Sequence, residues 1–324
     1  MSFTVSMYGK KNTGNGKFSS ATQAAFTPLR TVDFNGLSNN QSVSVNTSGS
    51  VAGKRFDADA TAGAGNTFLN GYGMRADTSV YMPGKTSSAK LSIAAGSDGD
   101  PAGGGSGTGY GPFGGWISFS GADKVAQGEE CWVQIKFKYE TGFDPYTNSV
   151  ALKFVRFETD ANQGRLEHHI TNGVANGSPT HSQVGWALAS EMAPKNQENT
   201  MFATQPKITM GEWQTWECYI KPHSDGAQSV RRIWLNGAFV YERNGNVNKY
   251  INTSGVLTTM TMSQAADKTL WDASDKLRSV FFHTYWNGGS PQNQAMWIQE
   301  INIHKNPATL TATDAYGNLM MGAF

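Results

Sequence analysis

The chain has 324 residues and a formal net charge of +1, and only 16% of its residues are charged. A chain this close to neutrality has no field of one sign that could hold nucleic acid or an anionic membrane. Its low charge, its 37 glycines and its frequent aromatic residues are instead typical of an all-β protein with many turns. We therefore expect neither nucleic acid nor a membrane as its partner.

The N-terminal part of the chain is polar and rich in Asn, Ser and Thr. We expect residues 1–60 to form an extended arm and residues 61–324 to form one β domain. The first residues have no apolar run of signal-peptide length, and no run approaches the roughly 18 apolar residues of a membrane span. We expect a protein without a secretion signal, located in the cytoplasm before release or in a virus particle.

A glycine-rich stretch at residues 98–115 predicts a flexible loop. It is not a phosphate-binding loop, because a strand-like segment follows it instead of a helix that begins with Lys-Ser or Lys-Thr. Asp98 and Asp100 lie close together in this stretch, so calcium binding there is an alternative that we keep, although the ligand series of an EF-hand is missing. We expect no other cofactor, since no His or carboxylate set has the spacing of a zinc site.

Strand patterns then follow one another closely. In "CWVQIKFKYE", apolar Val133, Ile135 and Phe137 alternate with residues of the other face, as in a half-buried antiparallel strand. Asn236-Gly237 between two apolar runs predicts a type I′ hairpin turn. The most helix-like segment is 262–279. The predicted strands are residues 116–120, 130–140, 149–158, 165–171, 183–190, 215–221, 229–237, 238–244, 279–286 and 296–305.

This succession of strands predicts an antiparallel two-sheet sandwich or jelly roll, because a parallel α/β fold would need helices between the strands. The two cysteines, Cys131 and Cys218, both fall in strand-like segments. We interpret them as free thiols in the core, although neighbouring strands could bring them together. Two cysteines in a chain of this length do not make a disulfide scaffold.

Three segments carry a resemblance to a known fold family. They are "GPFGGWISFSGADKVAQGEECWVQIKFKYETGFD" (111–144), "GEWQTWECYIK" (211–221) and "FFHTYWNGGSPQNQAMWIQEINIHK" (281–305). Over roughly residues 110–324 the chain resembles the concanavalin A-like jelly roll of alginate-lyase-type and glucuronan-lyase-type polysaccharide lyases, and related proteins of tailed phages. The resemblance implies a glycan on the concave outer face of one sheet.

Alternate residues of a strand lie on opposite faces of its sheet, so the odd or even position of a residue (its strand parity) indicates which residues belong to such a face. Trp132 is the candidate aromatic ring for stacking on a sugar. The glycan-binding candidates are Trp132, Gln134, Lys136, Lys138, Arg165, Glu167, His169, His283 and Tyr285. The face of Arg156 stays open, because Arg156 shares parity with the apolar Leu152 and Phe154. Since His168 and His169 point to opposite faces of their strand, at most one of them faces a site.

A lyase would need a cation or amide that neutralises the substrate carboxylate, a base for the C5 proton and an acid for the leaving oxygen. Arg165, His169, His283 and Tyr285 would supply these groups. The resemblance also implies two tyrosines one residue apart, and "HTYW" offers only one. No Glu-x-Asp-x-x-Glu motif of a retaining glucanase occurs, which disfavours a hydrolase.

We therefore leave open whether the chain is an enzyme. The interpretation we favour from the sequence is a non-enzymatic virion or surface protein, a capsid decoration protein or a tail adhesion module. It would assemble with itself as a homo-oligomer or with other virion subunits, and it could bind surface polysaccharide on its concave sheet. The alternative is a polysaccharide lyase that cleaves an anionic uronate polymer by β-elimination, and a lectin-like module without turnover is a third reading.

Overall fold

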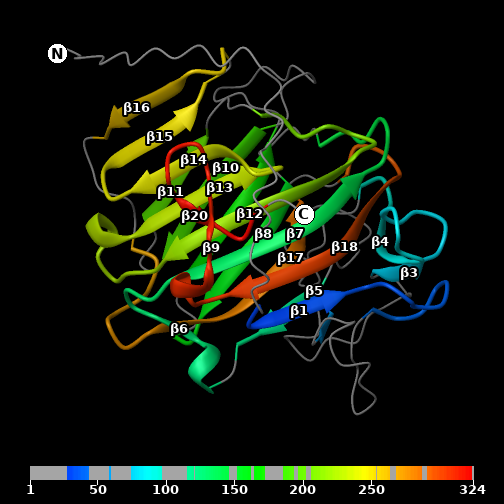
Figure 1. Ribbon diagram of the computed structural model, residues 1–324, viewed down its shortest axis with the longest axis horizontal. Helices are drawn as coiled ribbons and strands as arrows, with labels where there is room; N and C mark the ends of the chain where they lie inside the picture. Colours follow the sequence, from blue (N-terminus) through cyan, green and yellow to red (C-terminus); the bar gives the residue numbers. More distant parts are fainter. Residues whose placement is uncertain are drawn as a thin grey trace.

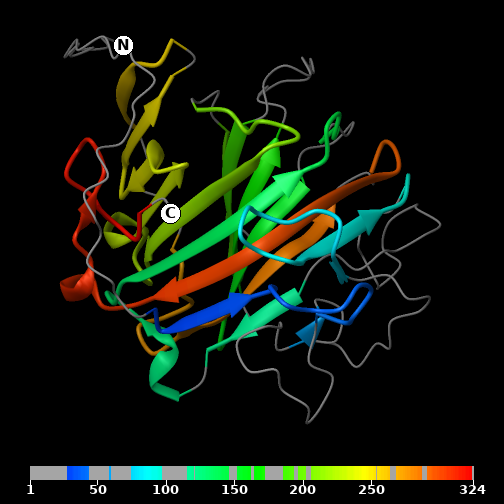
Figure 2. The ribbon, with the colours of Figure 1, turned by 45° about the vertical axis from the view of Figure 1, so that its right-hand side comes forward.

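Two antiparallel β-sheets packed face to face form the body of the protein (Figures 1 and 2). The computed structural model of the chain describes residues 28–43, 58–59, 74–96, 115–119, 121–145, 152–161, 164–171, 185–192, 196–201, 206–252, 254–262, 268–286 and 290–322. Helical structure in these residues is limited to short 3-10 turns, so the all-β prediction is confirmed. In the same residues we find no helix with the length and apolar character that a membrane crossing requires.

The large sheet contains ten strands of the described chain, in the order β16-β15-β14-β13-β12-β7-β18-β4-β3, with β1 paired to β18. Its central strands, β7 and β18, correspond to two of the strands predicted from the sequence. The bounds are β1 Arg30–Asp33, β3 Arg75–Asp77, β4 Ser88–Ile93, β7 Cys131–Tyr139, β12 Trp213–Lys221, β13 Val230–Leu235, β14 Ala238–Asn244, β15 Val247–Ile251, β16 Leu257–Thr261 and β18 Gln294–His304.

The small sheet contains eight strands of the described chain, in the order β11-β10-β9-β8-β17-β5-β2, with β6 paired to β17. The bounds are β2 Ala58–Asp59, β5 Gly115–Ser118, β6 Val125–Ala126, β8 Leu152–Thr159, β9 Gly164–Thr171, β10 Gly185–Met192, β11 Asn196–Met201 and β17 Lys276–Trp286. A separate hairpin joins β19 (Ala312–Thr313) to β20 (Leu319–Met320). The 3-10 turns are η2 Gly121–Asp123, η3 Gly226–Gln228 and η4 Pro307–Thr309.

The core lies between the two sheets, where alternate residues of facing strands meet. The Phe137 ring of β7 packs against the Phe154 ring of β8, with centroids 5.2 Å apart. The Trp216 ring of β12 meets the His168 ring of β9 edge-on at 5.3 Å. All four side chains are buried. This apolar contact between the sheets is the main source of their association.

Two local predictions have opposite outcomes. Asn236 and Gly237 both have positive φ, 50° and 75°, as the predicted hairpin turn between β13 and β14 requires. The helix expected within 262–279 is wrong where the chain is described, because residues 268–275 form turns and β17 follows. The Asp272 and Asp275 carboxylates accept hydrogen bonds from nearby backbone amides, and such contacts favour turns over a helix.

Part of the predicted N-terminal arm belongs to the sandwich. Strand β1 pairs with β18, and the side chains of Val32 and Phe34 are fully buried in the main core. The local sequence pattern of this short segment could not predict the pairing, because the partner strand is more than 250 residues away in the sequence. The other parts of that expected arm, residues 1–27, 44–57 and 60, lie outside the described residues, as do Asp98 and Asp100 of the calcium prediction.

The C-terminal segment, residues 310–322, lies on the outer face of the large sheet (red in Figure 1). Its side chains complete a second apolar cluster with aromatic residues of that face. The buried members of this cluster are Trp132, Tyr219, Trp234, Phe239, Leu310, Met320 and Met321. The outer face of the large sheet is therefore partly an interior surface, even though it faces away from the main core.

Candidate functional site

The nine residues predicted to line a glycan face lie on two different sheets. Those of β7 belong to the large sheet, whereas those of β9 and β17 belong to the small sheet. Because the sheets pack face to face, their outer surfaces point in opposite directions, and the nine residues cannot form one surface. On β7 lie Trp132, Gln134, Lys136 and Lys138; on β9 lie Arg165, Glu167 and His169; on β17 lie His283 and Tyr285.

Trp132 and Gln134 are buried beneath the C-terminal segment, with 1% and 0% of their surface exposed. The Trp132 indole N–H donates to the backbone oxygen of Leu319 at 3.2 Å. The Gln134 amide donates to the backbone oxygen of Gly322 at 2.6 Å. Strand parity placed both residues correctly on the outer face, but it could not reveal the segment that covers them. Neither side chain is open to a sugar ring in this structure.

Glu217 of β12, which the sequence analysis did not single out, lies in the same covered region. Its carboxylate accepts a hydrogen bond from the Met321 backbone amide at 2.5 Å and from the Gln134 amide at 3.1 Å. Burial raises the pKa of Glu217 to about 7, although these hydrogen bonds act in the opposite direction. Its partners, the Gln134 amide and the backbone of Met321 and Gly322, are all neutral, and they fasten the C-terminal segment to this carboxylate.

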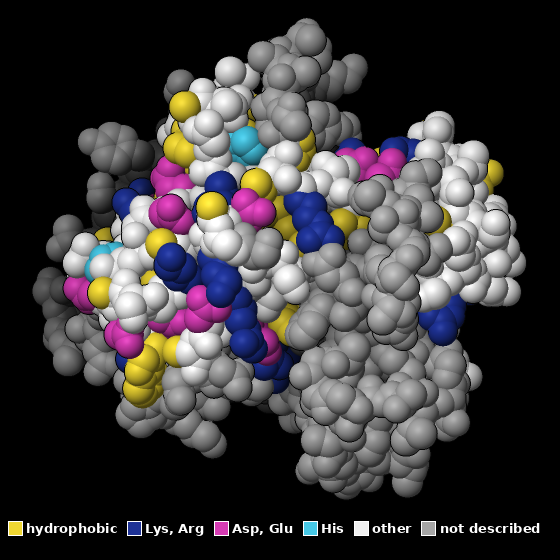
Figure 3. Space-filling view, turned by 90° about the horizontal axis from the view of Figure 1, so that it is seen from below, with side chains coloured by type: hydrophobic (Ala, Val, Ile, Leu, Met, Phe, Trp, Pro, Cys, Tyr) yellow, Lys and Arg dark blue, Asp and Glu magenta, His cyan; other side chains and the backbone are white. Residues whose placement is uncertain are grey.

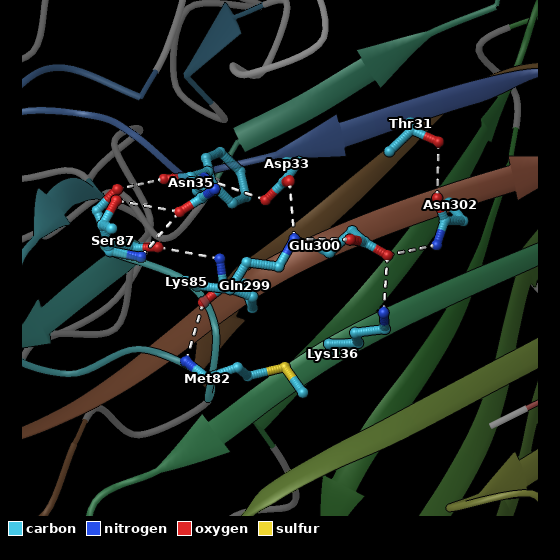
Figure 4. A network of polar contacts seen from close by, with 12 residues as sticks. Thr31, Asp33, Asn35, Met82, Lys85, Ser87, Lys136, Gln299, Glu300 and Asn302 are labelled. Carbon is cyan, nitrogen blue, oxygen red and sulfur yellow. Dashed lines mark hydrogen bonds and ion pairs between the residues drawn. The ribbon is translucent and has the colours of Figure 1, made fainter. Parts of the chain in front are cut away.

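Lys136 is held in an ion-pair network on the same sheet (Figure 4). Its ammonium lies 2.9 Å from the Glu300 carboxylate of β18, which also lies 3.5 Å from Lys85. Lys85 in turn pairs with Asp33 of β1 at 2.9 Å. Asn302 donates to the same oxygen of Glu300 that Lys136 contacts. Lys136 therefore joins β7 to β18, and through Lys85 to β1.

The small sheet brings the remaining candidates together on neighbouring strands. In the register of β17, β8 and β9, Lys153 of β8 is the direct partner of both His169 and Tyr285. These three residues form one row across three adjacent strands. The position of His283 falls in a register shift between Phe282 and Tyr285, so no partner in β8 is assigned to it. Lys153 was missing from the sequence-based set.

A β-bulge in β8 explains why parity failed there. The register shifts between Lys153 and Val155, and both Phe154 and Val155 are fully buried in the core. A bulge places one additional residue in a strand, so the alternation of faces changes phase. Lys153 and Arg156 therefore belong to the same outer face despite their odd and even numbers, which settles the face of Arg156.

A small ionic cluster continues this face next to the Lys153 row. Arg156 contacts the Glu158 carboxylate at 2.6 Å, and Arg278 contacts its other oxygen at 3.2 Å. The Arg156 guanidinium also lies over the Phe281 ring, 5.9 Å from its centroid. Glu158 therefore bridges an arginine of β8 and an arginine of β17 on this face.

The register places the other β9 candidates beside this cluster. Glu167 is the direct partner of Arg156, and Arg165 is the direct partner of Glu158. Three successive rows of the small sheet thus contain Lys153 with His169, Arg156 with Glu167, and Glu158 with Arg165. For the β9 residues and for Tyr285 the structure describes only the position in the strand. These positions are adjacent to one another on β8, β9 and β17.

His168, next to His169, belongs to the core. Its Nε2 lies 3.6 Å from the Cys218 sulfur, and its ring contacts Trp216 and Phe157. Burial raises the pKa of the Cys218 thiol well above its ordinary value, so this buried pair is unsuited to thiolate chemistry. Both cysteines are free and buried, as the sequence suggested. The described residues include no group of three or more His, Cys, Asp or Glu side chains that could hold a metal ion.

Comparisons with known proteins match at the level of overall structure only. No protein-family model matches the chain, and no curated protein matches its sequence. An alginate lyase in complex with alginate tetrasaccharide is 14% identical, with a TM-score of 0.45, and the match covers 86% of this chain and 96% of that one.

Two further solved structures are similar in the same way. The alginate lyase vAL-1 from Chlorella virus is 12% identical with a TM-score of 0.43, and the match covers 72% of this chain and 90% of that one. An endo-β-1,4-glucuronan lyase from the fungus Trichoderma reesei is 14% identical with a TM-score of 0.43, and the match covers 87% of this chain and 98% of that one. At these identities and TM-scores, the similarities assign neither a family nor an activity to this chain.

Proposed function

We propose that the protein binds a carboxylate-bearing polysaccharide on the outer face of the small sheet and cleaves it by β-elimination. One observation carries this proposal. Lys153 lies in register between His169 and Tyr285, next to the Arg156–Glu158–Arg278 cluster. A cation, an imidazole and a phenol in one row are the three kinds of group that this reaction needs.

The chemistry assigns a role to each group. The Lys153 ammonium neutralises the carboxylate at C6 of the uronate, which makes the proton on C5 more acidic. His169 removes that proton, and its electron pair forms the C4–C5 double bond while the bond from C4 to the glycosidic oxygen breaks. Tyr285 gives its proton to the departing oxygen. The reaction is balanced without water, oxidant or metal, and it leaves an unsaturated uronate at the new non-reducing end.

Lys153 is suited to its role by its surroundings. Only 8% of its surface is exposed, so a carboxylate bound there would be shielded from water and its attraction to the ammonium would be stronger than on an open surface. The adjacent cluster places the guanidinium groups of Arg156 and Arg278 on the same face, and guanidinium groups are suited to pair with the carboxylates of a polymer. The virion interpretation stays a prediction, because no contact in the described residues and no comparison supports it.

The test is absorbance at the unsaturated-uronate band after purified protein is incubated with alginate, glucuronan and hyaluronan. We expect a rise with at least one polymer and a loss of at least about 100-fold in rate for Lys153→Ala. The control is Lys249→Ala, which removes a lysine with a 45% exposed side chain on the large sheet and should leave the rate unchanged. A flat trace with every polymer would reject the lyase. Retention of a polymer without any absorbance change would favour a lectin-like module.

A further inference from the structure

We propose that the large sheet carries a second, non-catalytic site for a carboxylated polysaccharide, formed by a row of aromatic and cationic side chains. This site lies on the opposite side of the molecule from the Lys153 row. It would hold the polymer while the other face acts on it, so it goes beyond the proposed cleavage and does not depend on it.

The row follows from the register of five neighbouring strands. Trp213 of β12 pairs with Lys138 of β7, and Lys138 pairs with Trp297 of β18. Trp297 then pairs with Lys90 of β4, and Lys90 pairs with Arg75 of β3. These strands lie side by side in Figure 2. With strands about 4.8 Å apart, the five side chains follow a line of about 19 Å, which is long enough for several sugar units.

The positions of this row face away from the main core. The residues that flank it in the strands, including Phe137, Ala89 and Ala76, are buried in the core, and strand residues alternate between faces. Trp213, Lys138, Lys90 and Arg75 are each partly exposed, whereas Trp297 is 6% exposed and forms the floor. The C-terminal segment covers the other end of this sheet face, over Trp132 and Trp234, and its buried cluster does not include these five residues.

The cations of this row lack the acidic partners that other cations on the sheet have. Among the residues that the structure describes, Lys138, Lys90 and Arg75 form no ion pair, whereas Lys136, Lys85 and Arg232 each contact a carboxylate. Lys90 instead lies over the Trp297 ring, 5.7 Å from its centroid. Three neighbouring positive charges repel one another, and an anionic ligand would relieve this repulsion.

Asp77 lies two residues from Arg75 in β3, and both of its carboxylate oxygens accept hydrogen bonds. It accepts hydrogen bonds from the Trp297 indole N–H at 2.8 Å and from the backbone amide of Ser79 at 2.7 Å. Burial raises the pKa of Asp77, but these donors, the Ser79 hydroxyl and the charge of Lys90 outweigh it and hold the pKa below its usual value. Asp77 thus stays ionised and fixes the Trp297 ring beneath Lys90.

The mixture of rings and cations favours a carboxylated glycan. Sugar C–H faces stack on indole rings, and carboxylates pair with Lys and Arg, so alternating groups suit a polymer with both features. Nucleic acid fits less well, because the net charge is only +1. On the side of the molecule seen from below in Figure 3, Lys and Arg lie among Asp and Glu, so positive charge does not dominate that side either. A polyuronate therefore matches the row better than a uniformly dense polyanion.

The test is affinity electrophoresis of Lys153→Ala protein through gels that contain alginate, glucuronan or uncharged dextran. The Lys153→Ala background keeps the polymer intact. On this background, one variant carries both Lys90→Gln and Lys138→Gln. The matched control carries both Lys124→Gln and Lys249→Gln, which change the charge by the same amount. We expect the first pair to weaken retention by alginate or glucuronan at least five-fold and the control pair to have little effect. Retention should fall as NaCl is raised from 50 to 500 mM, and dextran should not retain the protein.

Three results would overturn the second site. They are equal retention of the two pairs of variants, no retention by either polyuronate, and equally strong retention in gels that contain single-stranded DNA. Thermal unfolding of each variant checks that the fold is intact, and Trp213→Ala should weaken retention separately from the charge change. Because cleavage is followed by absorbance and this site by retention, a failure of one leaves the other measurable.

Discussion

The Glu217 carboxylate accepts a hydrogen bond from the Met321 backbone amide at 2.5 Å, which fastens the last described turn of the chain to the middle of the large sheet. Glu217 is almost fully buried, and its other hydrogen-bond partners, the Gln134 amide and the Gly322 backbone, are also neutral. A buried carboxyl group with neutral partners resists ionisation. The attachment of the C-terminal segment should therefore depend on pH.

We predict that the free energy of unfolding falls as pH rises from about 4.5 to about 7 because of Glu217. Burial raises the pKa of Glu217 from 4.5 to about 7, so in this window the folded protein binds more protons than the unfolded chain, and stability is lost as pH increases. The full effect is on the order of 3 kcal/mol. Urea unfolding of the wild type and of Glu217→Gln at several pH values measures it.

The difference between wild type and Glu217→Gln is the informative quantity, because the other carboxylates contribute equally to both proteins. Relative to the wild type, the Gln variant should gain stability steadily between pH 4.5 and 7 and then level off. A difference that stays constant across this window would show that Glu217 ionises normally in the folded protein.

The C-terminal segment should contribute to stability as a core element does. Met321 is fully buried in the second apolar cluster, so Met321→Ala should cost about 2–5 kcal/mol although it lies three residues from the last position of the sequence. Tyr316→Ala, at a residue that is 50% exposed, should cost less than about 1 kcal/mol. Denaturant unfolding compares them, and equal small losses would mean that the segment is only loosely attached.

Local sequence patterns predicted the strands better than their partners. The alternation in β7 and the Asn236-Gly237 turn depend on neighbours in the sequence, and the structure has both. Which strands share a sheet depends on contacts between distant segments, for example the pairing of β7 with β12 and β18. The β7 candidates and the β9 candidates therefore appeared to share one face in the sequence, although they belong to opposite sheets.

Two features of the candidate site could not be predicted for more specific reasons. The bulge at Phe154–Val155 changes the phase of β8, so a strict two-residue alternation cannot place both Lys153 and Arg156 on the face that they share. Trp132 looked like an exposed ring because its strand neighbours are polar. One of those neighbours, Gln134, is buried and donates to the backbone of the C-terminal segment, so its polarity does not indicate an exposed face.

The Lys136–Glu300 ion pair should be worth more than an exposed pair. Both side chains are only slightly exposed, 11% and 14%, and Glu300 also accepts from Asn302. We expect Glu300→Gln to cost about 2 kcal/mol, more than Lys136→Met, because the loss of Glu300 leaves both Lys136 and Lys85 without this carboxylate. A double-mutant cycle should give a coupling of about 1–2 kcal/mol.

The comparison pair for this cycle is Lys249–Glu242, in which the Lys249 side chain is 45% exposed and the distance is 3.3 Å. Its coupling should be below about 1 kcal/mol, because solvent screens exposed charges. If the two couplings were equal, partial burial would not strengthen the network in Figure 4, and Lys136 would be available for another role.

Gly245, in the turn between β14 and β15, should tolerate no side chain. Its φ is +53°, and a Cβ atom there would lie 2.6 Å from the backbone oxygen of Ala227. Gly255 also has a positive φ, +75°, but a Cβ atom there would meet nothing within 4 Å. Gly255→Ala should therefore cost only the strain of a positive φ in a residue with a side chain, about 1–2 kcal/mol. Gly245→Ala adds a clash with the backbone of Ala227, which would have to move.

We expect Gly245→Ala to cost at least about 3 kcal/mol in denaturant unfolding. Equal losses for the two variants would mean that the turn around Ala227 shifts freely, and that the contact between η3 and this hairpin does not hold the edge of the large sheet.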